Sequence, residues 1–190
     1  MDALLALGDR VRFLRGNADR HVLERLDETA SWCCDRLGVD RATLVGGWPE
    51  TLVLAVEGLG PVRFCHATPR SDEEIVTRIT PVQAILKMLE GTIEPVVVGG
   101  HTHVQFDRRL DWRRLVNVGS VGWPYEGRPG AYWGLLGPDV ELVRTQYDLT
   151  SASALLQASG YPFREGSAAE RLAGATAEEA TAHFESLRDP

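Results

Sequence analysis

Residues 95–100 (PVVVGG) form a continuous apolar run that ends in two glycines and leads directly into His101-Thr102-His103. A short run of β-branched residues bounded by glycine is typical of a strand that is buried on both faces. Strands of this kind belong to sheets that are covered on each side by another layer. The run therefore predicts a layered α/β domain.

Other parts of the chain carry strand or helix periodicity of their own. We expect strands over residues 11–14, 51–56, 61–65, 114–118, 131–136 and 140–147, and helices over residues 20–37 and 80–90. Gly38 is a natural stop for the first helix, and Thr80 and Pro81 suit the start of the second. Strands dominate the middle of the chain and helices its ends, as an α/β domain requires.

The length and charge of the chain limit its organisation and its partners. Its 190 residues predict a core over residues 1–150 and a C-terminal extension over residues 151–190, with two short helices that pack on that core. A net charge of -7 disfavours binding to a nucleic acid polymer, which needs a basic face. The sequence has no long apolar run and no signal-peptide layout, so we expect a cytoplasmic protein with no membrane partner.

The three cysteines are Cys33, Cys34 and Cys65. Their odd number and the adjacency of the first two exclude a disulfide framework and favour a reduced compartment. Cys33 and Cys34 lack the two-residue spacer of a redox or zinc pair and lie in a segment with helix periodicity. We therefore interpret them as small apolar residues of a packed helix face.

Three of the five histidines follow predicted strands: His66 follows one strand, and His101 and His103 follow another. Loops at strand ends are where open α/β sheets build their sites. In extended backbone, side chains two residues apart point to the same side, so His101 and His103 can reach one metal while Thr102 points elsewhere. Gly100 permits a tight turn beside them. Because neutral imidazole is a good ligand for zinc, manganese or iron, these residues predict a metal site.

Four blocks of the sequence together resemble the motifs of calcineurin-like metallophosphoesterases, in particular their small bacterial branch. In order, they are Arg15-Gly16-Asn17-Ala18-Asp19, Cys65-His66-Ala67-Thr68-Pro69, Gly100-His101-Thr102-His103 and Val116-Asn117-Val118-Gly119-Ser120-Val121-Gly122. Their order and spacing are similar to those of the family over nearly the whole chain. The resemblance implies an α/β/β/α sandwich with two divalent metals, in which a metal-activated hydroxide hydrolyses a small phosphate mono- or diester.

The resemblance also implies a role for individual residues. By motif position, Asn17, His66 and His101 would bind one metal and His103 the other, and Asn17 would also contact a phosphate oxygen. Three further residues would support the site: Asp19, Gly100 and Asn117. The metals implied are manganese, iron or zinc, with nickel and magnesium as alternatives.

Two features depart from the family pattern. Ala18 stands where the family has a histidine that acts as general acid or phosphate contact, which implies slower hydrolysis. The family opens with strands that carry Asp-x-His and Gly-Asp, and no such strands precede Asn17; Gly8-Asp9 lies in a different context. We therefore expect a sandwich that lacks its first strands, through a late start codon or a truncation. Its open sheet edge would allow homo-oligomers to form.

Two other functions stay open at this stage. The chain is alternatively a catalytically inactive domain of the same fold that binds a partner through the exposed sheet edge. A third interpretation is a mononuclear site in which His66, His101 and His103 bind one metal and water takes the fourth position.

Three more groups of residues have both a functional and a structural interpretation. Arginines 108, 109, 113 and 114 either grip an anionic substrate or lie on a solvated hairpin, which their interleaved aspartates favour. Residues 72–74 (DEE) either reach a metal or form the acidic first turn of a helix. Trp123 and Tyr125 either stack on a substrate ring or pack in a wall.

Overall fold

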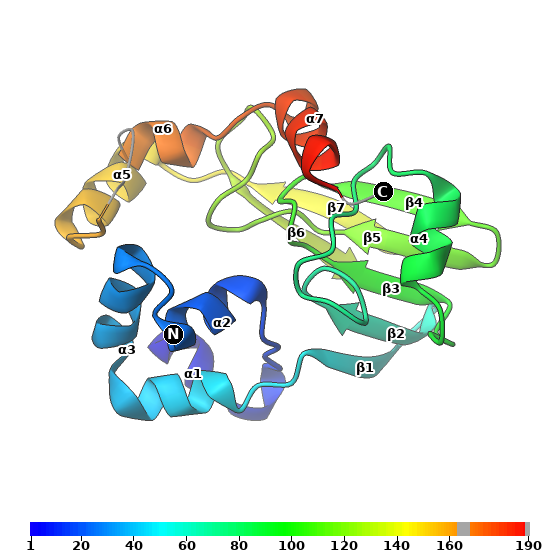
Figure 1. Ribbon diagram of the computed structural model, residues 1–190, viewed down its shortest axis with the longest axis horizontal. Coiled ribbons are helices and arrows are strands. Elements are labelled where there is room, and N and C mark those ends of the chain that lie inside the picture. Colours follow the sequence, from blue (N-terminus) through cyan, green and yellow to red (C-terminus); the bar gives the residue numbers. More distant parts are fainter. Residues whose placement is uncertain (163–167, 189–190) are drawn as a thin grey trace.

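The computed structural model describes residues 1–162 and 168–188. These residues form a five-stranded sheet, a two-stranded sheet and several helices around them (Figure 1). The strands are β1 (Thr51–Val56), β2 (Gly60–Cys65), β3 (Val96–Gly99), β4 (Phe106–Leu110), β5 (Arg113–Asn117), β6 (Ala131–Leu136) and β7 (Val140–Thr145). The helices are α1 (Asp2–Leu5), the 3-10 helix η1 (Gly8–Arg10), α2 (Asn17–Glu24), α3 (Glu28–Gly46), α4 (Val82–Met88), α5 (Leu149–Ala158), α6 (Ala168–Ala173) and α7 (Ala177–Leu187).

The larger sheet has the strand order β1-β2-β3-β5-β4. Its three central strands, β2, β3 and β5, run parallel, and the antiparallel strands β1 and β4 form its edges. The carboxyl ends of the parallel strands therefore meet at one end of the sheet, near helix α2 (Figure 1). This arrangement brings the loops that follow β2 and β3 together.

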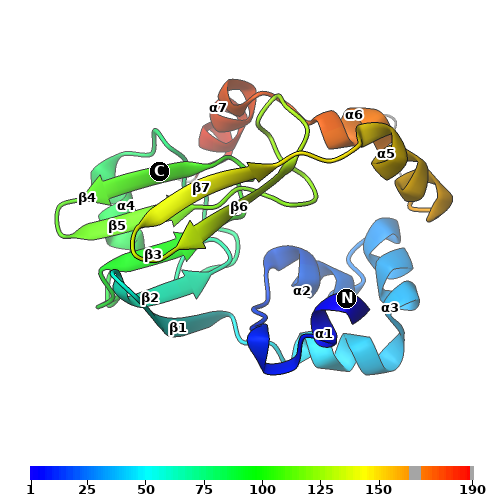
Figure 2. The same cartoon turned by 180° about the vertical axis from the view of Figure 1, so that it is seen from behind.

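Strand β3 is the centre of the core, and all four of its residues are buried. Val97 packs on one face of the sheet with Ile85 and Leu89 from the α4 segment. Val96 and Val98 pack on the other face, against the β6–β7 hairpin. Figures 1 and 2 show the resulting order of layers: helix α4, the five-stranded sheet, then β6–β7. The prediction of a layered α/β domain around a strand buried on both faces is confirmed.

The N-terminal region differs from the prediction. Residues 11–14 form no strand; Phe13 instead stacks on Trp48 with 4.7 Å between ring centroids. The helix predicted over residues 20–37 is two helices, because Arg25 adopts a left-handed φ of 55° and the Asp27 side chain caps α3 by accepting from the Ala30 N–H. Gly38, at φ 72°, kinks α3, and the helix continues beyond it to Gly46.

The second predicted helix and the C-terminal extension also differ in detail. Helix α4 is shorter than residues 80–90, and Thr80 does not cap it: the Thr80 hydroxyl accepts from the Thr77 N–H and contacts Glu185 of α7. The described residues of the extension form three helices in place of two. Helix α7 packs on the core through Ala177 and Ala180 against Val104.

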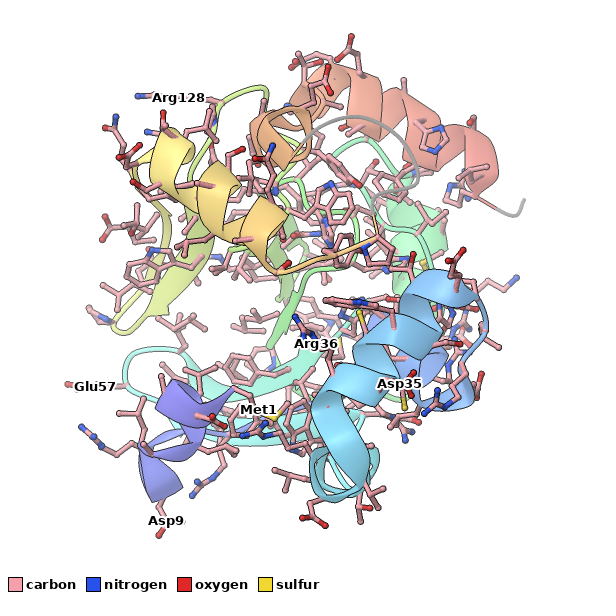
Figure 3. All side chains as sticks on the ribbon, turned by 90° about the vertical axis from the view of Figure 1, so that its left-hand side faces the viewer. Met1, Asp9, Asp35, Arg36, Glu57 and Arg128 are labelled. Carbon is pink, nitrogen blue, oxygen red and sulfur yellow. The ribbon has the colours of Figure 1, made fainter. Side chains whose placement is uncertain are left out.

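Helix α5 reaches across to the N-terminal helices, as Figure 3 shows for the face that carries Arg36. The Arg36 guanidinium of α3 donates to the Ser159 carbonyl at the end of α5 (2.5 Å), and Trp32 meets Tyr161 edge to face. Within the described residues, no helix is long and apolar enough to cross a membrane.

Candidate metal centre

His66 and His101 lie side by side where β2 and β3 end. The Nδ1 atom of His101 is 3.3 Å from Nε2 of His66, and the two ring centroids are 5.2 Å apart. The backbone joins the two loops as well, because the N–H of Gly100 donates to the carbonyl of His66 (2.7 Å). The parallel pairing of β2 and β3 therefore brings together two histidines that are 35 residues apart in the sequence.

The start of helix α2 packs directly on His66. A Cβ atom built on Gly16 would lie only 2.5 Å from Nδ1 of His66, so only a glycine leaves room for the ring. The N–H of Gly16 donates to the Asp19 carboxylate (2.9 Å), which fixes the first turn of α2. Asn17, half-buried, is the first residue of that helix. The Gly-Asn-Ala-Asp block and His66 thus meet in space.

The loop that carries His101 and His103 is not extended. The expectation that extended backbone points both side chains to the same side is therefore wrong. His101 and His103 both adopt left-handed backbone, at φ 67° and 57°. The N–H of Thr102 donates to the carbonyl of Gly100 (2.8 Å), which tightens the turn. Thr102 does point elsewhere, as expected: it is buried, and its hydroxyl donates to the Val76 carbonyl (3.3 Å).

His103 has a different environment from the other two histidines. Its ring stacks on Tyr125 with 5.3 Å between centroids and 25° between planes. Its Nδ1 atom is buried and has no hydrogen-bond partner among the described residues. Tyr125 is therefore a wall residue beside the site, one of its two predicted interpretations. The aromatic wall continues in Phe184 of α7, whose ring is 6.1 Å from Tyr125 and 6.4 Å from His101.

Asn117 ties the histidine loop to the end of β5. Its side-chain amide donates to the Gly100 carbonyl (2.5 Å) and to the Thr102 hydroxyl (3.0 Å). Its side-chain oxygen accepts from the N–H of Gly119 (2.8 Å). With these three hydrogen bonds, the buried Asn117 has the geometry of a positioning residue for the turn that carries His101.

Burial keeps the three imidazoles neutral. The pKa of His66 is lowered to about 4, mainly by burial and further by the neighbouring His101 and His103. Burial also lowers the pKa of His101 and of His103, although hydrogen bonds to backbone groups of Glu73 and Trp123 oppose it. A neutral imidazole offers a nitrogen lone pair, which is the form that binds metals.

The candidate ligands suit a divalent metal chemically, but too few of them converge on one point to hold an ion. Three neutral imidazoles and one carboxamide are suitable ligands for zinc, manganese or iron. However, residues 1–162 and 168–188 contain no group of three or more histidine, cysteine, aspartate or glutamate side chains placed to hold one ion. Only His66 and His101 approach each other directly, and the ligand set expected from the motifs stays a prediction.

The acidic residues 72–74 do not form a helix, so their interpretation as a helix start is wrong. Asp72 and Glu73 pair with Arg20 of α2, at 3.0 and 2.8 Å, and Glu74 pairs with Arg70 at 2.9 Å. The two pairs with Arg20 hold the loop after His66 against α2. Arg20 was not predicted as a residue of this region, although its place one helical turn after Asn17 puts it on the same helix face.

The arginines after the histidine loop are part of the predicted hairpin, β4–β5. Arg108 donates to the carbonyls of Thr77 and Thr80 at 3.2 and 2.6 Å. Arg113 donates to those of Leu89 and Thr92 at 2.8 and 2.7 Å. Arg114 pairs with Asp107 and Asp139. These three side chains fasten neighbouring segments together, which favours the structural interpretation over the substrate-binding one.

Comparison with known proteins adds evidence on the fold. No protein-family profile matches the sequence, and no curated protein matches it either. Among solved structures, hypothetical protein PH1004 from Pyrococcus horikoshii is similar with a TM-score of 0.70 and 17% identity, over 85% of this chain and 73% of that one. A metallophosphoesterase from Sphaerobacter thermophilus is similar with a TM-score of 0.67 and 22% identity, over 85% and 75%. Together with the order of its motifs, this likeness shows that the chain has the fold of calcineurin-like metallophosphoesterases.

Proposed function

We propose that the chain is a metal-dependent phosphoesterase that acts on a small phosphate mono- or diester. The observation that carries this proposal is the contact between the neutral imidazoles of His66 and His101, with the Gly16–Asp19 turn packed against it. Loops at the carboxyl ends of parallel strands are the usual place for a site in such a sheet. The similarity to a metallophosphoesterase supports the fold on which this proposal rests.

Each residue of the proposed site has a defined task. His66 and His101 would bind the cation, His103 would offer its buried Nδ1, and the Asn17 carboxamide would bind the metal and a phosphate oxygen. A divalent metal bound there supplies an activated hydroxide and neutralises charge on the phosphoryl oxygens. Manganese, iron and zinc all suit imidazole, and we propose two ions for a complete ligand set.

The same site predicts weak hydrolysis by this chain. Within the described residues no carboxylate joins the imidazoles, and Ala18 offers no proton to a leaving group. Loss of general acid catalysis costs about a hundred- to ten-thousand-fold in rate. We therefore expect slow, manganese-dependent turnover of bis-p-nitrophenyl phosphate.

The test combines metal binding with turnover in three proteins: the unaltered chain, His101→Ala and, as a matched control, His183→Ala, which removes an exposed histidine of α7. Calorimetry with Mn(II) and Zn(II) should show binding by the unaltered chain and by His183→Ala but not by His101→Ala. Turnover should follow the same order. Absence of both metal binding and turnover in the unaltered chain would contradict the proposal.

One observation favours a second candidate, a non-catalytic binding domain. Strand β1 is a sheet edge of six uncharged residues, and its Val53 and Leu54 side chains are 43% and 40% exposed. An exposed apolar edge is a template for pairing with another chain, either a second copy or a partner protein. Light scattering of the metal-free protein tests pairing with a second copy. Leu54→Lys should convert an oligomer to the monomer, whereas Glu57→Lys, just beyond the strand, should not.

We also propose the cytoplasm as the location of this protein. Its three cysteines are all free thiols in the structure, which agrees with a reducing compartment. Alkylation of the protein inside intact cells, followed by mass spectrometry, should find Cys33 reduced; a disulfide at that position would contradict this location.

A further inference from the structure

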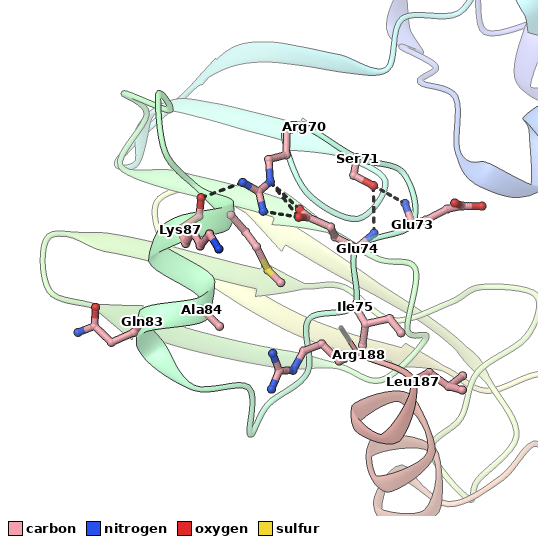
Figure 4. Close-up of a pocket in the computed structure, with 11 residues that line it drawn as sticks. Arg70, Ser71, Glu73, Glu74, Ile75, Gln83, Ala84, Lys87, Leu187 and Arg188 are labelled. Atoms are coloured by element: carbon pink, nitrogen blue, oxygen red, sulfur yellow. Dashed lines mark hydrogen bonds and ion pairs between the residues drawn. The ribbon is translucent and has the colours of Figure 1, made fainter. Parts of the chain in front are cut away.

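A separate cavity lies between the loop of residues 70–75, helix α4 and the end of α7 (Figure 4). Its volume is about 590 Å³, which is within the range of small-molecule sites. None of its lining residues belongs to the proposed metal centre. The cavity therefore needs an explanation of its own.

Three cationic side chains line this cavity: Arg70, Lys87 and Arg188. The chain as a whole carries a net charge of -7, so this is a local excess of positive groups. Arg70 is fully engaged, since it pairs with Glu74 and donates to the Lys87 carbonyl (3.2 Å). The Lys87 ammonium, by contrast, makes no hydrogen bond or ion pair within the described part of the chain.

The two carboxylates of the lining pair with arginines and, within the described residues, leave the charge of Lys87 unpaired. Glu74 is held by Arg70 and by the Thr68 hydroxyl (2.5 Å). Glu73 is held by Arg20 and His21 of α2, at 2.8 and 3.2 Å, and in Figure 4 its carboxylate points away from the cavity. Both acids are thus satisfied by other partners, and Lys87 faces the space without a carboxylate of its own.

Arg188 stands on the opposite wall. Its Nε forms an ion pair with Glu185 (2.9 Å), which fixes the plane of the guanidinium and leaves its outer N–H groups directed elsewhere. In Figure 4 the group extends across the cavity toward α4. A fixed guanidinium opposite an ammonium suits a phosphate or carboxylate group, which accepts hydrogen bonds from both.

The remaining wall is largely apolar, with Ile75, Ala84, Met88 and Leu187. Leu187 is 56% exposed, so its side chain has little cover in the structure. An inorganic ion would leave this wall in contact with water. An anion with an attached aromatic or aliphatic group would cover it, which is favourable in proportion to the apolar area buried.

We propose that this cavity binds a small organic anion. Its phosphate or carboxylate group contacts Lys87 and Arg188, and its apolar part packs on Ile75, Met88 and Leu187. This site is independent of the metal centre, and its ligand need not be a substrate of the phosphoesterase reaction.

Lys87 is the only lysine of the chain, which makes a selective experiment available. Reductive methylation with ¹³C-formaldehyde keeps the positive charge and labels only Lys87 and the N-terminal amine. The labelled, metal-free protein is titrated with phenyl phosphate, with benzoate and with neutral benzyl alcohol. We expect a saturable shift of the Lys87 signal with at least one of the two anions, no shift with benzyl alcohol, and an unchanged N-terminal signal.

The two anions distinguish the preferred group: stronger binding of phenyl phosphate identifies a phosphate ligand, and stronger binding of benzoate a carboxylate. Arg188→Gln should weaken binding about tenfold, as expected for loss of a hydrogen bond to a charged group. Arg109→Gln, which alters an exposed arginine of β4, should leave it unchanged.

Three results would overturn this proposal: a Lys87 shift that does not saturate, an equal shift with sodium chloride, or equal affinity in Arg188→Gln. The His101→Ala variant separates this proposal from the proposed function. Its Lys87 shift should persist even though its metal binding is lost, and loss of the shift there would place the anion at the histidines instead.

Discussion

The two regions that meet at the candidate metal centre differ in how much of their surface is buried. The sheet and helix α4 form an apolar core in which every residue of β3 is buried. In the N-terminal region, α1 and α2 contain no buried residue and α3 contains three. Surface ion pairs such as Arg41–Asp2 and Arg25–Asp35 join its helices. His66, His101 and His103 thus follow strands of a well-buried sheet, whereas Asn17 comes from a region with little buried apolar area.

The largest expected effect is in the core of the sheet region. Ile85 is fully buried between α4 and the sheet, and Ile85→Ala should lower the free energy of unfolding by about 3 kcal/mol, since it leaves a cavity. Ile93→Ala removes the same atoms at a position that is 81% exposed and should change it by less than about 0.5 kcal/mol. Urea denaturation measures both. Equal effects would show that α4 does not pack as described.

The two regions can also be compared by removing one ion pair from each and measuring the loss of stability. Arg63 of β2 pairs with Glu94, whose side chain is only 6% exposed, so Arg63→Ala leaves a buried charge and should cost about 3 kcal/mol. Arg41 of α3 pairs with Asp2, whose side chain is 75% exposed, so Arg41→Ala should cost less than about 0.5 kcal/mol. Urea denaturation again provides the measurement, and a cost for Arg41→Ala that matches Arg63→Ala would remove the contrast.

The contact between the regions is tested at Gly16. A methyl group there would collide with the ring of His66, so Gly16→Ala should displace that ring and lower zinc affinity by at least about tenfold. Gly122→Ala is the matched control, because a Cβ at Gly122 meets no atom within 4 Å. Calorimetry with Zn(II) gives both affinities. If Gly16→Ala binds zinc normally, α2 does not pack on His66.

The last prediction concerns pH. In the metal-free protein, folded His66 accepts a proton only near pH 4, whereas in the unfolded chain it does so at its ordinary pKa of 6.5. The unfolded state therefore binds more protons between these values, and the free energy of unfolding should fall as the pH falls from about 6.5 to about 4. His66→Gln should flatten this dependence in urea titrations at several pH values. An identical slope in both proteins would contradict the burial of His66.

The sequence predicted best the strands that are either fully buried or paired with a neighbour close in sequence. The valines of residues 96–98 are buried, and the pairs β1–β2 and β6–β7 are antiparallel neighbours along the chain, so apolar runs and turn residues predict them. The proximity of His66 to His101 followed from the rule that strand ends meet, and the structure places those two rings together.

The errors fall where single contacts decide the structure. Phe13 stacks on Trp48 in place of strand pairing, and Arg25 breaks a helix with backbone that a periodic pattern does not reveal. His101 and His103 adopt left-handed backbone because Asn117 and the Thr102 turn hold the loop. Such conformations depend on long-range partners, so periodicity in one sequence does not predict them.

We infer that three imidazoles from two separate loops contribute to one metal site. Nitrogen-15 spectra of the five histidine side chains, recorded while Zn(II) is added, test it most directly. We expect the signals of His66, His101 and His103 to change together and to saturate at the same zinc concentration, while those of His21 and His183 stay unchanged. Independent responses of the three rings, or spectra that zinc leaves unchanged, would contradict it.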